Sequence, residues 1–289
     1  MRTIDFDLHI HCAPYSTCAT QTAEQAVLQA KEVGLKTIAV CNHNTVADLP
    51  AFRKLCDASG ITMINGIELA VSVPGLSPET DDKVFHLLGY GFAWKPESFE
   101  AALYEEQRNY EERLLKICEY LRTVGYDIVD CKSTKNLRLQ LVQKGYFSTE
   151  KEAKSYLGSQ AILERFPKRK MQAEKAVDLI HSLGGKVFWA HPNRAEGHKI
   201  ITPQQIEIIG DRLIGLGLDG LEVFHPDPVF APGAVEQLLS IAKERDLLVS
   251  LGSDTHHYHS RPTYFTQCVE LLSYRFDFEA LKNQLEEKL

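Results

Sequence analysis

The chain has 289 residues, of which 44% are apolar and 25% are charged, and its mean hydropathy is -0.21. This composition excludes a disordered chain, a collagen-like chain and a simple fibre, and the length allows two domains or one α/β barrel with an insertion. The formal net charge of -7 excludes a general electrostatic attraction to nucleic acid, so a phosphate-bearing ligand needs a local binding site.

Short apolar runs alternate with amphipathic runs in the first part of the chain. The patterns predict strands at 3–10, 37–41 and 62–68, and helices at about 22–33 and 46–59. Each predicted helix ends near a glycine that is followed at once by an apolar strand, which is typical of parallel β/α units. We therefore expect a sheet whose strands are mostly parallel.

The pattern changes after a further predicted strand at 85–91. From about 97 to 170 the chain is rich in Glu, Lys and Arg, and its apolar residues follow a helical spacing. We expect residues 97–170 to form a helical insertion subdomain. The segments 1–96 and 171–289 on either side of it are expected to build one β/α barrel.

The alternation of helices and strands resumes after the insertion. The remaining predicted elements are a helix at 172–183, a strand at 186–190, a helix at 202–213, a strand at 220–224, a helix at 234–245 and a strand at 247–251. The fold class is therefore α/β, with a barrel-like order of elements.

Nothing in the sequence indicates a membrane segment or a disulfide framework. No stretch approaches the roughly 18 apolar residues of a membrane helix, and the first residues lack the apolar core of a secretory signal. The seven cysteines contain no CxxC pair, which favours reduced thiols. We expect a cytoplasmic protein with no membrane partner, and the sequence sets no oligomeric state.

Metal-capable side chains lie where one predicted strand after another ends. These residues are His9, His11, His43, Glu68, His86, His191, Glu222, Asp254 and His256. Because the carboxyl ends of parallel strands converge on one face of the sheet, we expect these side chains to meet there. A mixed set of imidazoles and carboxylates suits Mn, Fe or Zn better than Ca or Mg.

Each of these residues also has an ordinary structural interpretation. His9 and His11 point to the same side of an extended strand, where they are either ligands or two solvent-facing histidines. Glu68 is either a carboxylate that bridges two metals or a solvated strand end, and His86 is either a ligand or a core histidine. His191 precedes Pro192, which favours an extended backbone at a strand-end ligand.

Six short motifs together resemble the polymerase and histidinol phosphatase (PHP) family of metal-dependent phosphoesterases. They are Asp7-Leu8-His9-Ile10-His11, Asn42-His43-Asn44-Thr45, Gly66-Ile67-Glu68, His86-Leu87-Leu88-Gly89-Tyr90, Ala190-His191-Pro192 and Gly252-Ser253-Asp254-Thr255-His256. The resemblance implies a distorted seven-stranded β/α barrel, with the insertion covering the active-site face, and two or three divalent metal ions. Segments of the insertion resemble the branch that hydrolyses 3′,5′-nucleoside bisphosphates and trims 5′ nucleotides from short RNA.

The resemblance also implies how the ligands divide. His9, His11, Glu68 and Asp254 would hold one metal, His86 and His191 a second that shares Glu68, and His43 and His256 a third position or the phosphate. Two departures from the family pattern stand out. The aspartate usual a few residues after the second histidine is missing in 12–18, and Asn42-His43-Asn44 stands where Asp-His-Asp is usual.

With such a cluster, we expect hydrolysis of a phosphate monoester of a small metabolite or nucleotide. Glu68, His191 and Asp254 would position the water that the metals activate. The candidate ligands of the substrate phosphate are Arg194, His225, Arg113 and Arg138. The basic run Lys168-Arg169-Lys170 is either a solvated face or a guide for a short oligonucleotide.

Two other functions stay open at this point. The first is a C–N hydrolase of the amidohydrolase type, which also has HxH on its first strand, although no strand-end lysine is found here to bridge two metals. The second is a degenerate barrel that binds metal for regulation. In that case the missing aspartate after His11 would mark the loss of activity.

Overall fold

The structure, a computed structural model, describes residues 4–73, 76, 83–167, 170–195, 199–226 and 233–259. The chain divides into two compact units. The first comprises residues 1–100 and 171–289, and the second comprises residues 101–170. Each unit contains its own cluster of buried apolar side chains.

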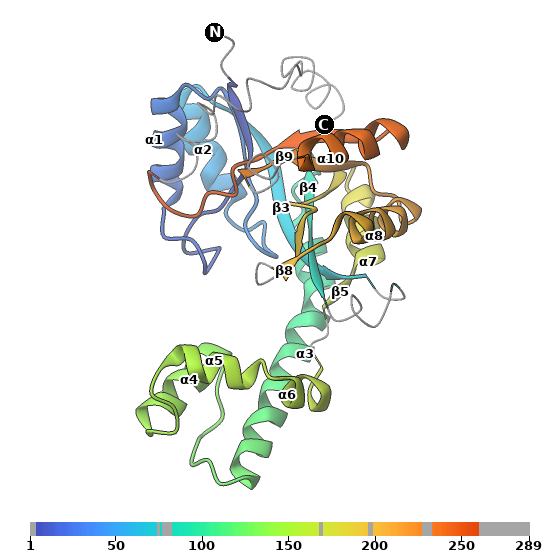
Figure 1. The fold of residues 1–289 in the computed structure, drawn as a ribbon. Helices are drawn as coiled ribbons and strands as arrows, with labels where there is room; N and C mark the ends of the chain where they lie inside the picture. Colours follow the sequence, from blue (N-terminus) through green and yellow to red (C-terminus); the bar gives the residue numbers. More distant parts are fainter. Residues whose placement is uncertain are drawn as a thin grey trace. The chain divides into compact units, whose positions relative to one another are not determined.

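The first unit is built from alternating strands and helices. In chain order these are β1 (Phe6–Ile10), α1 (Ala23–Val33), β2 (Thr37–Val40), α2 (Leu49–Ser59), β3 (Thr62–Ser72), β4 (Val84–Tyr90), β5 (Met171–Gln172), α7 (Ala173–Ser182), β6 (Lys186–Trp189), β7 (Arg194–Ala195), β8 (Lys199–Ile200), α8 (Pro203–Gly215), β9 (Gly220–Phe224), α10 (Ala234–Glu244) and β10 (Leu248–Leu251). In the view of Figure 1, α1 and α2 lie on one side of the sheet and α7 and α8 on the other.

Seven of these strands form one continuous sheet in the order β1-β2-β3-β4-β6-β9-β10, and β5 pairs with β3 beside this path. The first and last strands of the path also approach each other. An isolated parallel bridge joins Ile10 to Thr255, and the backbone N–H of His11 donates to the carbonyl of Thr255 over 2.9 Å. The prediction of a distorted seven-stranded β/α barrel is thus confirmed.

The strand directions differ from the expectation at one place. β4 runs antiparallel to both of its neighbours, β3 and β6, whereas the other strands along the path pair in parallel. Its amino end therefore lies at the edge of the sheet where the parallel strands have their carboxyl ends. A residue near the beginning of β4 can reach the same place as residues that end the other strands.

Local sequence explains most element boundaries in this unit. Thr22 forms a capping box with Gln25 at the start of α1, and Gly34 ends the helix in a left-handed conformation. α2 begins at Leu49 instead of about residue 46, with Asp48 as its N-cap and a proline in its first turn. β3 continues beyond Glu68 to Ser72, because its second half pairs with β4.

The second unit is helical. It contains most of α3 (Pro96–Thr123), together with α4 (Thr134–Gln143), α5 (Glu150–Leu157) and α6 (Gln160–Arg165). Its core comprises Leu114, Ile117, Cys118, Leu121, Ile128, Leu137, Leu141, Ala153 and Ile162, all of them buried. The prediction of a helical insertion is confirmed, whereas its covering of the active-site face stays a prediction.

No helix in the part of the chain that the structure describes is long and apolar enough to cross a membrane. The six cysteines in that part are free thiols, and Cys268 lies outside the described residues. Free thiols agree with the expected reduced state. The expected cytoplasmic location stays a prediction.

Candidate metal centre

β1 delivers two histidines to one side of the sheet. Along this strand Phe6, Leu8 and Ile10 alternate with Asp7 and His9, so the apolar and the polar side chains point to opposite faces. His11 follows directly after the strand and continues the polar series. All of these residues are buried, which means that the polar face of β1 is enclosed by protein.

Glu68 and two further histidines come from the neighbouring strands. His43, just after β2, forms a parallel bridge with Glu68 in β3. In β4, His86 pairs with Ala70 and therefore sits diagonally across from Glu68 on the same face. His86 lies near the start of its strand, not at its end as expected. The antiparallel direction of β4 is what brings it to the cluster.

His191 and Asp254 follow β6 and β10 in strained backbone conformations. His191 has a φ of 33° and Asp254 a φ of 52°, in a region that non-glycine residues seldom adopt. The prediction that Pro192 holds His191 extended is wrong. Tertiary contacts override that local preference, because the His191 N–H donates to Glu222 Oε2 over 2.8 Å and its ring lies 3.1 Å from Glu68 Oε1.

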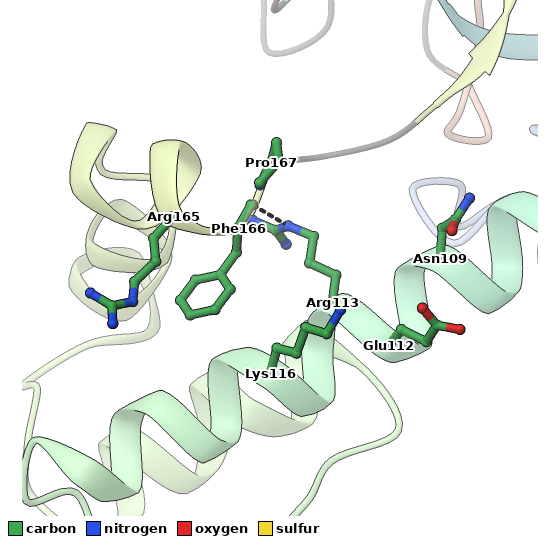
Figure 2. A pocket seen from close by; sticks show the side chains of 7 residues that line it. All are labelled: Asn109, Glu112, Arg113, Lys116, Arg165, Phe166 and Pro167. Atoms are coloured by element: carbon green, nitrogen blue, oxygen red, sulfur yellow. Dashed lines mark hydrogen bonds between the residues drawn. The ribbon is translucent and has the colours of Figure 1, made fainter.

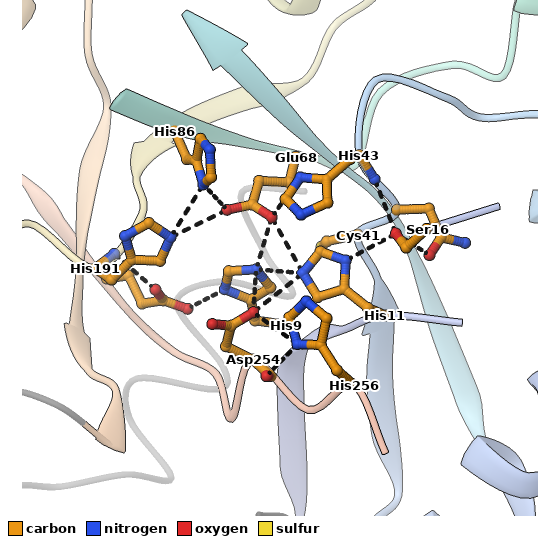
Figure 3. Close-up of polar contacts among 12 residues, drawn as sticks. His9, His11, Ser16, Cys41, His43, Glu68, His86, His191, Asp254 and His256 are labelled. Carbon is orange, nitrogen blue, oxygen red and sulfur yellow. Dashed lines mark hydrogen bonds and ion pairs between the residues drawn. The ribbon is translucent and has the colours of Figure 1, made fainter. Parts of the chain in front are cut away.

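Four side chains of the cluster surround a common point with their nitrogen and oxygen atoms (Figure 3). They are His9, His11, Glu68 and Asp254. His11 Nε2 lies 3.1 Å from Glu68 Oε2, from Asp254 Oδ1 and from His9 Nε2. His9 Nε2 lies 3.4 Å from Glu68 Oε2 and 3.6 Å from Asp254 Oδ1. Ligands 2.0–2.2 Å from a tetrahedral metal stand about 3.3–3.6 Å apart, so this spacing fits the coordination shell of one ion.

Two further groups of donors adjoin the first. Around the other oxygen of Glu68, His86 Nδ1 lies at 2.7 Å and His191 Nε2 at 3.1 Å. On the far side of His11, the rings of His43 and His256 stack on it with centroids 4.6 and 4.2 Å away. The structure thus brings together all eight residues expected to bind metal.

The carboxylates of this cluster stay ionised. Burial alone raises the pKa of Glu68, but its interactions with His86, His9 and His11 lower it well below its usual value. Burial also raises the pKa of Asp254, and His9 and His11 outweigh this effect, so that the pKa is again well below its usual value. Two ionised carboxylates buried in the same cluster need positive charge between them.

The pKa shift of His9 is opposite in direction to those of His43 and His191. Burial lowers the pKa of His9, yet attraction to Glu222, Glu68 and Asp254 raises it well above its usual value. For His43 and His191 burial prevails and lowers the pKa to about 3 and about 4. His43 and His191 are therefore neutral at pH 7 and offer free lone pairs. Protonated His9 supplies a positive charge that a metal ion would replace.

A second layer of polar groups orients the cluster. Glu222 accepts a hydrogen bond from His9 Nδ1 over 2.7 Å and from the His191 N–H, which fixes His9 with Nε2 toward the cluster. Asp7 accepts from the backbone N–H groups of His9 and Ser253 over 3.1 and 2.9 Å. The interpretation of Glu222 as a buried partner of a ligand histidine agrees with these contacts.

Sequence reasoning missed a chain of hydrogen-bonded contacts behind His11. Its Nδ1 lies 3.1 Å from the Ser16 hydroxyl, which donates to Asn42 Oδ1 over 2.8 Å. The Asn42 amide in turn donates to Asp48 Oδ2 over 2.7 Å. Ser16 thus occupies part of the stretch in which the usual aspartate is missing. A serine in a loop is too common for its spacing from His11 to have revealed this role.

The expected phosphate ligands divide between the two units. Arg194 forms an ion pair with Asp254, and buried His225 has Nε2 3.6 Å from Asp254 Oδ2, so both lie at the cluster. Arg113 and Arg138 belong to the helical unit. Arg113 donates to the carbonyl of Phe166 and Arg138 pairs loosely with Glu150.

Comparison with known proteins places this geometry in context. A family model described as PHP domain matches residues 7–179. A phosphoribosyl 1,2-cyclic phosphate 1,2-diphosphodiesterase of Eggerthella lenta is 26% identical over 86% of this chain and 93% of its own length. A 5′-3′ exoribonuclease of Haemophilus influenzae is 27% identical over 88% of this chain and 90% of its own length.

Two solved structures have a similar fold. One, from Bifidobacterium adolescentis and named as a candidate metal-dependent phosphoesterase, has a TM-score of 0.66 and 22% identity, covering 98% of this chain and 96% of its own. The other, an amidohydrolase from Chromobacterium violaceum with bound sulfate, has a TM-score of 0.66 and 20% identity, covering 89% of each chain. At these identities the two structures show the fold alone.

Proposed function

We propose that this chain, which belongs to the PHP domain family and is a metal-dependent phosphoesterase, hydrolyses a ribose phosphate ester at the cluster around Glu68. The family model spans more than half of the chain and contains four of the six motifs, those from His9 to His86.

The observation that carries the proposal is the four-donor set of His9, His11, Glu68 and Asp254. Glu68 Oε2 is buried and has no hydrogen-bond partner of suitable geometry among the described residues. Histidine nitrogens nevertheless surround this oxygen at 3.1–3.4 Å. Nitrogen lone pairs and a carboxylate oxygen repel one another unless a proton or a shared cation lies between them, so the donor set fits a divalent metal.

Glu68 is the residue best placed to serve two ions, because each of its oxygens faces a different group of histidines. Divalent cations bound there would polarise a phosphoryl oxygen and lower the pKa of the attacking water. Arg194 and His225 lie beside Asp254, where a guanidinium fork can hold the substrate phosphate. Glu222 and Asp7 keep the ligands in place while substrate enters.

The types of donor atom in the cluster indicate which metal binds and how many ions it holds. A set of imidazoles and carboxylates favours Mn, Fe or Zn over Ca or Mg. The third group, of His11, His43 and His256, contains nitrogen donors only. The hydroxyl of Ser16, which contacts His11, is neutral and adds no negative charge to this group. We therefore propose two firmly bound ions and a third that binds more weakly.

The substrate is proposed from the curated relatives. One is named for a phosphoribosyl cyclic phosphate and the other for ribonuclease action, so ribose phosphates are common to both names. We propose a 3′,5′-nucleoside bisphosphate or the 5′ end of a short RNA. The relatives' names describe diester cleavage, so the expected preference for a monoester has to be tested against diesters.

The test begins with the full chain purified without chelator. Its metal content is measured by elemental analysis, and its turnover on a panel of 3′,5′-bisphosphates, 5′-phosphorylated short RNA, a cyclic ribose phosphate and histidinol phosphate. We expect bound metal and release of product from at least one ribose phosphate. His9→Ala and Asp254→Ala should each lose metal and at least about 100-fold in turnover.

His181→Ala is the matched control, because His181 also faces a carboxylate, Asp219, but lies outside the cluster. It should retain both metal and turnover. If His9→Ala and Asp254→Ala kept their metal and their activity, the site assignment would be wrong.

A further inference from the structure

The helical unit contains a pocket of its own (Figure 2). Its volume is about 230 Å³, and its lining residues come from α3 and from the segment around the end of α6. The volume lies below the roughly 300 Å³ at which pockets for whole small molecules begin. The pocket therefore fits one chemical group of a larger ligand better than an entire cofactor.

Positive charge prevails in this pocket. Arg113, Lys116 and Arg165 line it together with one acid, Glu112. The carboxylate of Glu112 is already 3.7 Å from Arg108, one turn earlier on the same helix. Among the described residues, neither Lys116 nor Arg165 has an acidic side chain within ion-pair distance, so both charges remain available to an anion.

The two arginines are held in place before any ligand binds. Arg113 donates from Nε to the carbonyl of Phe166 over 2.6 Å, and its Nη2 is buried without a hydrogen-bond partner in the described part of the chain. The guanidinium of Arg165 lies over the ring of Tyr120, 4.6 Å from its centroid. Ordered guanidinium groups lose little further freedom when they bind an oxyanion.

We propose that this pocket binds a backbone phosphate of single-stranded RNA, as a secondary contact for a substrate whose 5′ end is processed elsewhere in the chain. The proposal rests on the proposed function, which makes RNA a substrate. Three cations around a small, open volume match a phosphate, which carries a full charge and several acceptor oxygens. An RNA chain offers such groups at every nucleotide along its length, whereas a nucleoside bisphosphate has only one phosphate besides the one that is hydrolysed.

The experiment measures RNA binding to the full chain by fluorescence anisotropy. The probe is a 5′-phosphorylated RNA of about 12 nucleotides with a 3′ fluorophore, in buffer with chelator so that cleavage stops. We expect Lys116→Glu to weaken binding about fivefold or more, and Lys116→Gln to lower the slope of log affinity against log salt by about 0.7. The same variants, loaded with metal, should keep wild-type kcat/KM on a nucleoside bisphosphate.

Lys151→Glu is the control of equal charge change, because Lys151 is exposed on α5 in the same unit and lies outside the pocket. It should bind RNA almost as the wild type does. The pocket proposal is overturned if Lys116→Glu and Lys151→Glu weaken binding equally, or if a polyglutamate peptide competes as well as RNA.

The outcomes also separate this proposal from the proposed function. Loss of RNA affinity in Lys116→Glu, combined with no cleavage of any phosphoester by the wild type, would refute the function and leave the pocket. Cleavage of RNA by the wild type, combined with unchanged affinity in Lys116→Glu, would refute the pocket alone. Circular dichroism of each variant verifies that the helical unit is folded.

Discussion

At the scale of single residues, Gly252 shows how tightly the centre is built. A Cβ atom at this position would lie 2.2 Å from His9 Cβ and 2.5 Å from Glu222 Oε1. Both neighbours belong to the layer that orients the metal-capable side chains. The loop that carries Asp254 can approach β1 this closely only because residue 252 has no side chain.

We predict that Gly252→Ala displaces His9 or Glu222 and weakens metal binding. Overpacking of this kind costs about 1–3 kcal/mol of stability. Metal content after dialysis and the free energy of unfolding in urea measure the two effects. Gly215→Ala is the control, since nothing lies within 4 Å of a Cβ there. Equal behaviour of the two variants would contradict the proposed packing.

Glu222 provides a second test at this scale. Glu222→Gln keeps an acceptor for His9 Nδ1 but removes the charge that supports it. Such changes in the partner of a ligand histidine typically cost about 10–100-fold in metal affinity. A Zn²⁺ titration against a chromophoric chelator measures the affinity. Exposed Glu207→Gln should leave it unchanged, and an unchanged value for Glu222→Gln would rule out the orienting role.

At the scale of elements, Asp219 connects three parts of the barrel. Asp219 lies just before β9. It accepts hydrogen bonds from His181 Nε2 in α7 over 2.7 Å, and from Lys186 Nζ and the Val187 N–H in β6 over 2.8 Å each. Burial raises its pKa, but the hydrogen bonds from Lys186, His181 and Val187 lower it below its usual value. The ionised form is therefore the one that stabilises the fold.

The lowered pKa predicts a definite pH dependence. The stabilisation by Asp219 is fully present above the unfolded pKa of about 3.9 and is lost as the pH falls through the lower folded pKa. Asp219→Asn should lower the free energy of unfolding by about 1 kcal/mol at pH 7, because two of the partners are partly exposed. Urea unfolding with chelator present measures this difference.

Below a pH of about 3 the difference between Asp219→Asn and the wild type should shrink. Asp178→Asn, an exposed change on α7, should have no effect at either pH. A destabilisation by Asp219→Asn that grew at acid pH would show that the sign of the argument is wrong.

At the scale of the whole molecule, the two units have separate cores. Leu141 is fully buried in the core of the helical unit, whereas Leu115 of the same unit is 42% exposed. We predict that Leu141→Ala destabilises the helical unit by about 2–5 kcal/mol and leaves the metal content unchanged. Hydrogen exchange of residues 101–170 and elemental analysis measure the two quantities.

Leu115→Ala should change exchange in the helical unit by less than about 0.5 kcal/mol. Loss of bound metal in Leu141→Ala would mean that the centre depends on the core of the second unit. The separation of the two cores would then not extend to their stability.

The sequence by itself determined the class of the fold and identified the metal-capable residues that come together on one face of the sheet. Alternating polarity along β1 places His9 and His11 on one face, and helix-ending glycines mark successive β/α units. Both signals are local, because side-chain direction and helix termination depend on residues a few positions apart. This is why the candidate ligands could be identified without knowing which strands are neighbours.

Only the tertiary structure decided how these residues meet. The antiparallel direction of β4 brings His86 to the centre from the start of its strand, and contacts with Glu222 and Glu68 hold His191 at a positive φ despite Pro192. The support of His11 by Ser16 joins two loops through a single hydroxyl. Strand pairing and loop packing depend on contacts between distant residues, and a single sequence carries no periodic signal for them.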